Sequence, residues 1–383
     1  SGAATLKHTN NTKLATTSIG ISVTGGVVSD GMSTNTSGTS NFIAGVNAGN
    51  SIESGGNYNV VVGDEAGTAI TTGDYNVAVG YQAGTAVSTG VQNTLIGGLA
   101  GDALTTGVQN VAVGYNALST EDGHGANVAV GMNALSTQNA GADAYNTAVG
   151  HAAGANVTTG IKNTIIGGLA GDAITAGANN VALGFEALST NTASNGNVAI
   201  GYEALEAFNV TSDTTTFNTA VGTQAGKALT TGVNNTLIGG LAGDAITTGN
   251  SNAALGFGAL GSNTTASDNT ATGVNALTAN TTGGSNVAVG TYSLTANTTA
   301  ANNTAVGYGS LRANTTGAFG IAFGSGALGG NTTGNANIGI GYNALDSNTT
   351  ADYNIGIGHD ALGLNTTGAN NVAIGIFALD ANT

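Results

Sequence analysis

The stretch NTLIGGLAGDALTTG, residues 93–107, decides the fold because it is repeated almost unchanged. It returns as NTIIGGLAGDAITAG at 163–177 and as NTLIGGLAGDAITTG at 235–249. Three near-copies in one chain of 383 residues indicate a repeat architecture. The repeating unit therefore has to be defined before any single residue is interpreted.

The unit aligns on the pattern Asn-x-Ala-x-Gly, with the Asn as position 1 and the Gly as position 5. That Gly recurs twenty times from Gly45 to Gly375, in steps of 17 residues apart from single steps of 18, 19 and 21. Gly320 replaces the Asn once. In and beside the quoted stretches the pairs are Asn93 with Gly97, Asn110 with Gly114, Asn163 with Gly167, and Asn235 with Gly239.

The composition favours an ordered repeat protein, and it argues against nucleic acid and lipid membranes as partners. Charged residues make up 7% of the chain, against about 25% in ordinary globular proteins. There are 65 Gly, no Pro and no Cys, and Val, Ile and Leu are regularly spaced. A net charge of −15 repels phosphate and anionic lipid, so we expect neither a nucleic-acid partner nor membrane insertion.

The unit predicts an all-β parallel β-solenoid, or β-roll, of about twenty 17-residue coils. Positions 1 to 5 read N-V-A-V-G or N-T-A-V-G, which is a short strand with positions 2 and 4 on one face and a Gly corner. The closing Thr-Thr-Gly makes a second corner. Coils stacked about 4.8 Å apart give a rod of about 95 Å, and the position-1 Asn side chains should form an amide ladder along it.

A trade of side-chain volume supports stacked coils. Position 9 is Gly in eight units, and position 12 is then always aliphatic, as in Gly101 with Leu104. Position 9 is Leu in the other twelve, and position 12 is then polar except at Phe208. A core of constant density predicts this trade. In the quoted stretch we expect Leu95 and Leu99 to supply the volume that Leu at position 9 supplies elsewhere.

The chain divides by the type of unit. We expect residues 1–40 to be a β-rich cap or attachment segment and 41–383 to be the solenoid shaft. Within the shaft, 41–251 mixes Gly-type and Leu-type units, and 252–383 is uniformly Leu-type. The chain begins with Ser1 and stops inside a unit at Thr383, so we expect a processed form or a piece of a longer protein. A coil this poor in large residues has a thin core, which favours a homotrimer that buries a second apolar face.

The motif N-T-A-V-G-Y-x-A-L followed by N-T-T-G resembles the repeats of phage tail-fibre-like proteins of the marine type, over about residues 41–383. Residues 4–32 resemble the β-rich lead-in of such repeats, a strand-turn-strand segment ending in V-T-G. More distantly, N-x-A-x-G is similar to the head repeats of trimeric autotransporter adhesins. That resemblance implies a left-handed parallel β-roll in a trimer, although the coils of those adhesins are shorter.

Candidate metal sites are weak in the sequence. Asp102, Asp172 and Asp244 share one position in the three Gly-Gly units, and three copies of one Asp could hold a cation in a trimer. Calcium usually needs six to eight oxygens from a dedicated loop, so we favour solvated corner carboxylates and expect no metal or cofactor. His124, His151 and His359 have no Cys or His partner at ligand spacing and are interpreted as surface residues.

Catalytic and nucleotide sites are not favoured. Gly97-Gly98 and Gly356-x-Gly358 lack the Lys and Ser or Thr of a phosphate loop. Glu203 with Glu206, or Asp64 with Glu65, could form the acid and base of a glycosidase, but the coils are too regular for a glycan-cleaving spike. We therefore expect no enzyme.

Two surface features could make contacts. Position 6 carries aromatic residues, for which we favour packing over sugar binding: Tyr81, Tyr115, Phe185, Tyr202, Phe257, Tyr308 and Tyr342. The insertions near Ala140–Ala144 and Val210–Phe217 break the regular surface and are secondary candidates for side contacts.

These observations predict a mechanical and adhesive role, as the shaft of a trimeric virus tail fibre located in the virion. Its expected partners are itself, other tail proteins and, through a tip, a host cell-surface glycan or protein. One alternative is a trimeric adhesin or filament on a bacterial surface or outside the cell. Another is an ice-binding β-solenoid, which would need a flat exposed Thr-x-Thr ladder.

Overall fold

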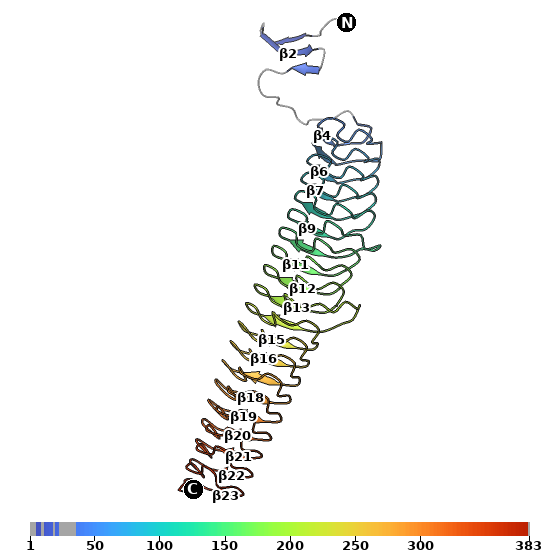
Figure 1. The fold of residues 1–383 in the computed structure, drawn as a ribbon. Helices are drawn as coiled ribbons and strands as arrows, with labels where there is room; N and C mark the ends of the chain where they lie inside the picture. The colour runs from blue at the N-terminus through green and yellow to red at the C-terminus, as the bar shows by residue number, and fades with distance from the viewer. Residues whose placement is uncertain (1–4, 9–10, 18–19, 23–35, 382–383) are drawn as a thin grey trace.

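The computed structural model describes residues 5–8, 11–17, 20–22 and 36–381. It shows a long parallel β-solenoid, in which one chain winds through about twenty stacked coils (Figure 1). The predicted all-β solenoid is confirmed, and each coil contributes one three-residue strand at positions 2 to 4.

The strands of the solenoid form one sheet that runs its whole length. They are β4 (Phe42–Ala44), β5 (Val60–Val62), β6 (Val77–Val79), β7 (Thr94–Ile96), β8 (Val111–Val113), β9 (Val128–Val130), β10 (Thr147–Val149), β11 (Thr164–Ile166), β12 (Val181–Leu183), β13 (Val198–Ile200), β14 (Thr219–Val221), β15 (Thr236–Ile238), β16 (Ala253–Leu255), β17 (Thr270–Thr272), β18 (Val287–Val289), β19 (Thr304–Val306), β20 (Ile321–Phe323), β21 (Ile338–Ile340), β22 (Ile355–Ile357) and β23 (Val372–Ile374).

Each strand pairs in parallel with the next, position 2 against position 2. The longer steps keep this register, since Val128 pairs with Thr147 and Val198 with Thr219. Consecutive strands alone are paired, and β4 and β23 lie at opposite ends of the rod, so the sheet is open (Figure 1). The inserted residues are looped out of the coil instead of shifting the sheet.

Residues near the N-terminus form a separate small sheet. Strand β1 (Thr5–His8) pairs antiparallel with β2 (Asn11–Thr17), which pairs antiparallel with β3 (Gly20–Ser22). The Val23-Thr24-Gly25 end of the predicted lead-in lies outside the described residues.

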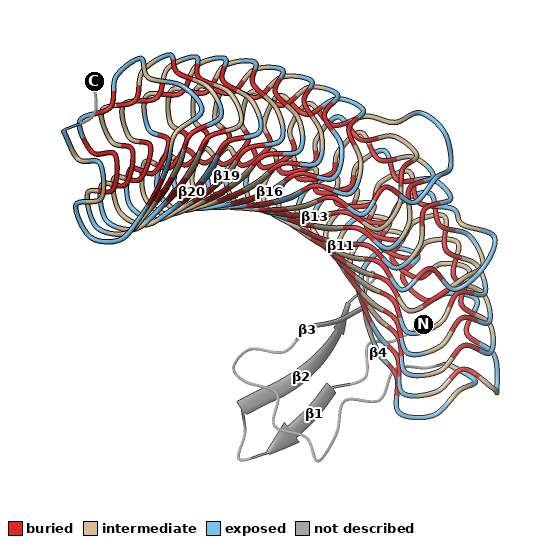
Figure 2. Cartoon of the chain, turned by 90° about the horizontal axis from the view of Figure 1, so that it is seen from below, coloured by how far each residue is buried: buried red, intermediate tan, exposed pale blue. Residues whose placement is uncertain are grey.

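The core is a narrow column along the inside of the coils, in which small Ala side chains lie beside larger Leu and Ile side chains. Position 3, as at Ala112 and Ala288, and position 8, as at Ala117, are fully buried. The strand residues on either side of position 3 are more exposed. The buried strip follows the inside of every coil, and the sheet lies along the inner side of the curved rod (Figure 2).

The expected amide ladder runs through this core. The backbone N–H of Asn93 donates to Oδ1 of Asn76 at 3.0 Å, and Nδ2 of Asn93 donates across its own coil to the carbonyl of Gly107 at 2.8 Å. The side chain at position 1 therefore closes its own coil and also anchors the next one. Buried polar groups are retained where they are bonded in this way.

A second amide ladder was not predicted. At position 12 of the C-terminal coils, Nδ2 of Asn297 donates to Oδ1 of Asn280 at 2.9 Å and to the carbonyl of Ala300 at 3.0 Å. The sequence showed only that position 12 is polar in these coils, not that its side chains bond to one another. In a coil, position 12 faces the interior beside the position-1 column, so a polar residue there has to find bonds along the stack.

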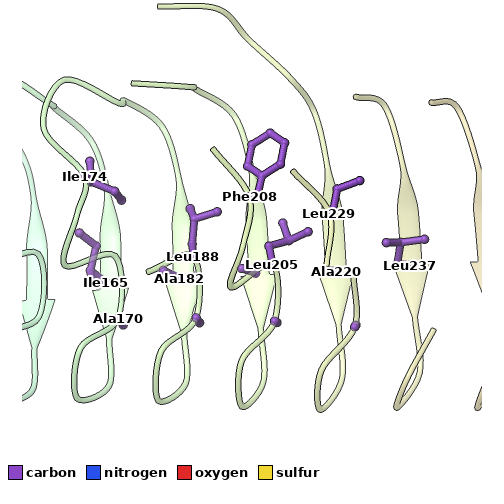
Figure 3. Close-up of a cluster of buried hydrophobic side chains, with 14 of the residues drawn as sticks. Ile165, Ala170, Ile174, Ala182, Leu188, Leu205, Phe208, Ala220, Leu229 and Leu237 are labelled. Atoms are coloured by element: carbon purple, nitrogen blue, oxygen red, sulfur yellow. The ribbon is translucent and has the colours of Figure 1, made fainter. Parts of the chain in front are cut away.

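The predicted exchange of side-chain volume between neighbouring positions is confirmed by the packing around the Gly residues at position 9. A methyl group added to Gly101 would lie 2.7 Å from Cδ2 of Leu95, and one added to Gly171 would lie 2.8 Å from Cδ1 of Ile174. Residues 95 and 174 thus fill the space that a Leu at position 9 fills in other coils. Figure 3 shows Ile174, Leu188, Phe208 and Leu229 in successive coils of the buried column. The expectation for Leu99 was wrong, because Leu99 is only half-buried and lies outside the fully buried column.

Left-handed backbone occurs at fixed positions of the coil. The Gly at position 5 has φ between 130° and 141°, and a Cβ on Gly114 would lie 2.5 Å from the carbonyl oxygen of Gly131. Positions 7, 9 and 17 are also left-handed, mostly with side chains, as at Asn275 (φ 54°), Leu277 (φ 53°) and Ser285 (φ 57°). Bulky residues rarely adopt this conformation, which persists only when the surrounding structure enforces it.

Candidate functional site

The outer face of the sheet is an uncharged strip along the whole rod. Positions 2 and 4 of the twenty coils carry only Val, Thr, Ile, Leu, Ala or Phe, although the chain has 25 charged residues, 5 basic and 20 acidic. Several of these side chains are open to solvent in the single chain: Ile96, Leu183, Leu255, Phe323 and Ile374. We call this strip the outer sheet face.

An uncovered parallel sheet is unusual. All-parallel sheets occur almost only where both faces are packed, whereas antiparallel sheets tolerate one solvated face. The inner face here is covered by Ala, Leu and Asn of the same chain. In the single chain the outer sheet face has no cover among the described residues, so it is the largest candidate for an interface.

Aromatic side chains lie at both ends of the strands. All seven predicted position-6 residues are about half-exposed: Tyr81, Tyr115, Phe185, Tyr202, Phe257, Tyr308 and Tyr342. In three coils the ring lies over the second Gly of the preceding coil, since a Cβ on Gly98 would be 3.5 Å from the Tyr115 ring. Packing along the axis thus accounts for one face of those rings and for the repeated Gly-Gly.

A second aromatic column, missed in the sequence, stands at position 17 directly before the strand. Its exposed members are Tyr58, Tyr75, Tyr145, Phe217, Phe319 and Tyr353. The rings of Tyr58 and Tyr75 stack at 4.9 Å between centroids. The signal was available, because every one of these residues immediately precedes position 1, but small, polar and charged residues such as Ala126, Lys162 and Asp268 interrupt the column.

Tyr308 and Tyr342 are brought together at a shallow hollow. They lie two coils apart on either side of Ser325, and they line an open depression of about 450 Å³ with Arg312 and Asp346. The Arg312 guanidinium lies 5.6 Å from the centroid of the Tyr292 ring. Burial, followed by the nearby Asp360 carboxylate, raises the pKa of Asp346.

Asp102, Asp172 and Asp244 occupy one column but lie four coils apart, about 19 Å at the sheet spacing. One chain therefore does not gather them. These corner carboxylates are only partly solvated: each is half-buried, and burial raises the pKa of all three against opposing backbone hydrogen bonds. Oδ1 of Asp102 is buried without a hydrogen-bond partner among the described residues.

The paired carboxylates do not have the properties of an acid and a base. Glu203 and Glu206 both contact the Lys227 ammonium, Glu206 at 3.2 Å. Hydrogen bonds from Lys227, Tyr202 and Gln224 lower the pKa of Glu203 to about 2, whereas a general acid needs a pKa near neutral. The Asp64 side chain is exposed, and Glu65 accepts a hydrogen bond from Gln82 at 2.6 Å.

The three predicted surface histidines differ. His151 and His359 are exposed, and Nε2 of His359 lies 3.0 Å from the Asp360 carboxylate. His124 is not isolated, because Nδ1 lies 3.3 Å from Oε1 of Glu121, which is fully buried. The prediction missed this contact because it searched for Cys or His partners and ignored the carboxylate three residues earlier.

The two insertions leave the even outline of the rod as loops (Figure 1). In the first, residues 140–144, Oδ1 of the exposed Asp143 accepts from the N–H of Gly125 at 2.9 Å. In the second, residues 210–217, Oγ1 of Thr216 donates to Oδ1 of Asn197 at 2.8 Å. Both loops are tied to a neighbouring coil, and both present exposed polar residues.

None of the described segments is a helix of the length and apolarity that a bilayer crossing requires. No protein-family model matches this chain, and no curated protein shows significant similarity to it.

Proposed function

We propose that the solenoid is a stiff shaft segment of a homotrimeric fibre, with three left-handed solenoids joined through their outer sheet faces. The observation that carries the proposal is the uncharged, uncovered parallel sheet in a chain of net charge −15. Exposing such an apolar sheet to water is unfavourable, so we expect it to pack against the same face of other copies of the chain.

The size of the face suits a stable association. Twenty strands at about 4.8 Å by three residues at about 3.3 Å give on the order of 900 Å² per chain. A standard specific interface buries about 800 Å² per partner. The gentle curvature supports chains wound about a shared axis, because the sheet lies on the inner side of the curve (Figure 2).

Within this proposal the fibre serves attachment. The motif resemblance to phage tail-fibre-like repeats supports a tail-fibre shaft in the virion, bound to other tail proteins and carrying a tip toward a host-surface glycan or protein. A trimeric adhesin of a bacterial surface would use the same architecture and is the alternative. Both roles need a spacer that keeps its length under load, which coil-to-coil hydrogen bonding supplies.

Ice binding is less well supported. A Thr-x-Thr strand on the outer sheet face occurs only in β17, at Thr270 and Thr272. The threonine pairs lie at a corner, where Oγ1 of Thr281 donates to the carbonyl of Thr298 at 3.0 Å. The hydroxyl of the first Thr in these pairs is therefore already bonded within the chain.

The solution mass of the 383-residue chain tests the proposal. Light scattering should give about three times 36.6 kDa. The double variant Val111→Lys/Val289→Lys, which puts charge on the outer sheet face, should dissociate into monomers that keep the β-sheet circular dichroism of the native chain.

The control is Thr282→Lys/Thr316→Lys, which adds the same charge at exposed corner positions and should stay trimeric. A native chain that is monomeric at micromolar concentration, or a sheet-face variant that remains a trimer, contradicts the proposal.

A further inference from the structure

The coil that begins with Asn110 departs from the repeat at its second corner without a change in length. In this coil, residues 121–124 read Glu-Asp-Gly-His where the C-terminal coils read Asn-Thr-Thr-Gly. Glu121 therefore stands at position 12, in the buried column of the second amide ladder. The next residues return to the pattern, so the change is confined to one corner.

The departure places a buried carboxylate beside an imidazole. The side chain of Glu121 is fully buried, and Oε1 lies 3.3 Å from Nδ1 of His124 and accepts the His124 backbone N–H at 3.1 Å. Oε2 of Glu121 is also buried and has no partner among the described residues. A buried carboxylate oxygen without a bond is costly, and such an atom calls for a ligand.

We propose that Glu121, Asp122 and His124 bind one divalent transition-metal ion, with zinc as the fitting probe. One ligand atom from each of the three residues lies within 4.8 Å of the others. Imidazole nitrogen with carboxylate oxygens suits zinc, at about 2.0 to 2.2 Å per ligand. The Asp122 side chain is exposed, so it can turn toward the other two ligands.

The ligand set distinguishes the ion from calcium and magnesium. Both of those ions prefer oxygen ligands throughout, six or more for calcium. An imidazole nitrogen selects zinc, copper, nickel or iron. One buried and one exposed carboxylate offset the charge of a divalent ion, and the ion supplies the missing partner for Oε2 of Glu121.

The backbone holds this corner in place without the ion. The carbonyl of Asp122 accepts the N–H and the hydroxyl of Thr105, and the carbonyl of His124 accepts Nδ2 of Asn110 at 2.9 Å. From the next coil, Oδ1 of Asp143 accepts from Gly125 and adds negative charge beside the site. The first insertion loop thus lies beside the site, and the proposal does not depend on the oligomeric state.

The test is a zinc titration of the chelator-stripped full chain by calorimetry, followed by visible spectroscopy with Co²⁺. We expect one site per chain with micromolar or tighter affinity and cobalt bands typical of mixed nitrogen and oxygen ligation. The variant Glu121→Asn/Asp122→Thr/Gly123→Thr/His124→Gly restores the repeat and should lose at least 100-fold in zinc affinity while keeping its fold.

Two single variants keep the test decisive if the four-residue variant fails to fold. His124→Gln, at a side chain 32% exposed, should lose at least 100-fold in affinity. His359→Gln, at the other histidine with a carboxylate contact, should leave the affinity unchanged. Absence of binding at 100 µM zinc, or equal binding by the native chain and the His124→Gln chain, overturns the proposal.

Discussion

The N-terminal coils of residues 41–251 and the C-terminal coils of residues 252–381 share one backbone but fill it differently. In the C-terminal coils, Asn occupies position 12 in every described coil from Asn263 to Asn365, which adds a second amide ladder beside the first. In the N-terminal coils, position 12 is aliphatic in eight coils, and the others carry Glu121, Gln138, Asn191 and Phe208.

The difference shows what each interior can tolerate. An aliphatic residue at position 12 packs against its own coil and the next, so the coils can vary one by one. In the C-terminal coils each Asn at position 12 is tied to its neighbours, because its Nδ2 and Oδ1 bond to Asn side chains of different coils. The buried Asn191 of the N-terminal coils has no Asn above or below it and instead bonds to Ser194 of its own coil. The N-terminal coils accordingly carry both insertions and the Glu-Asp-Gly-His corner, whereas the C-terminal coils are uniform.

The largest expected effect is the same in the N-terminal and the C-terminal coils, because both have the same Gly at position 5. Gly273→Ala in the C-terminal coils puts a Cβ 2.7 Å from the Gly290 carbonyl oxygen at φ 134°, and Gly114→Ala does the same in the N-terminal coils. Each should cost at least about 3 kcal/mol in the free energy of unfolding, measured by urea denaturation. Gly240→Ala is the control, because its backbone is not left-handed and an added Cβ would meet only the Phe257 ring, at 3.5 Å. A near-neutral Gly273→Ala would contradict the stacking geometry.

Removing one amide side chain from the C-terminal ladder should destabilise the adjacent coils as well as the coil that carries the substitution. Nδ2 of Asn314 donates to Oδ1 of Asn297 at 3.0 Å, and Asn331 donates to Asn314 at 2.9 Å. Asn314→Ala should cost about 2 to 4 kcal/mol and lower amide-exchange protection in both adjacent coils. The N-terminal counterpart Ile174→Ala should leave a cavity and lower protection mainly in its own coil. If both variants lost amide-exchange protection over the same number of coils, the ladder would not couple the stability of neighbouring coils.

Converting one coil type into the other tests the volume trade. Gly171→Leu alone collides with Ile174, and Ile174→Asn alone buries an amide that has no ladder neighbour on one side. Each single change should destabilise by about 1 to 3 kcal/mol. Combined with Ile165→Ala, the triple variant should recover at least about 1 kcal/mol of the summed cost in a thermodynamic cycle. Additive costs would show that the three sites do not share one space.

Restoring the missing Asn should stabilise the chain. Gly320 interrupts the position-1 ladder, so Asn337 has no amide oxygen to receive its backbone N–H, while Asn303 still bonds to Gly320. Gly320→Asn should raise stability by about 1 kcal/mol through the restored bond and a stiffer unfolded chain. Gly320→Ala separates the two contributions, since it supplies only the second. A loss of stability in both variants would indicate that the 3.0 Å approach of Cβ to Asn303 Oδ1 is not relieved.

The smallest expected effect is the loss of stability at low pH that comes from Glu203. The pKa of Glu203 is lowered from 4.5 to about 2 in the folded chain, chiefly by the Lys227 hydrogen bond. A lowered folded pKa adds stability that is complete above pH 4.5 and is lost as pH falls toward 2. The melting temperature of the native chain should therefore exceed that of Glu203→Gln at pH 6 and approach it near pH 2. Because the ion pair is partly exposed, salt should shrink the gap.

The fold could be predicted from the sequence because the Asn and Gly columns leave few alternatives. The period, the strand at positions 2 to 4 and the ladder at Asn93 all follow from residues that repeat at fixed spacing. The left-handed backbone at Leu277 could not be predicted, because an isolated Leu avoids that conformation and only the stack enforces it. The contact between Glu121 and His124 was missed because it is a single deviation from a repeat, and repeats direct attention to what stays the same.

The left-handed positions have a consequence for how the solenoid is built. A lone coil would hold positions 7, 9 and 17 in a conformation that costs roughly 1 to 2 kcal/mol each, with no neighbour to compensate. A coil added to a finished coil gains its amide and backbone bonds at once. Assembly along the chain therefore resembles crystal growth, with a slow nucleation event followed by rapid elongation. Refolding should show a lag that a preformed stretch of coils removes.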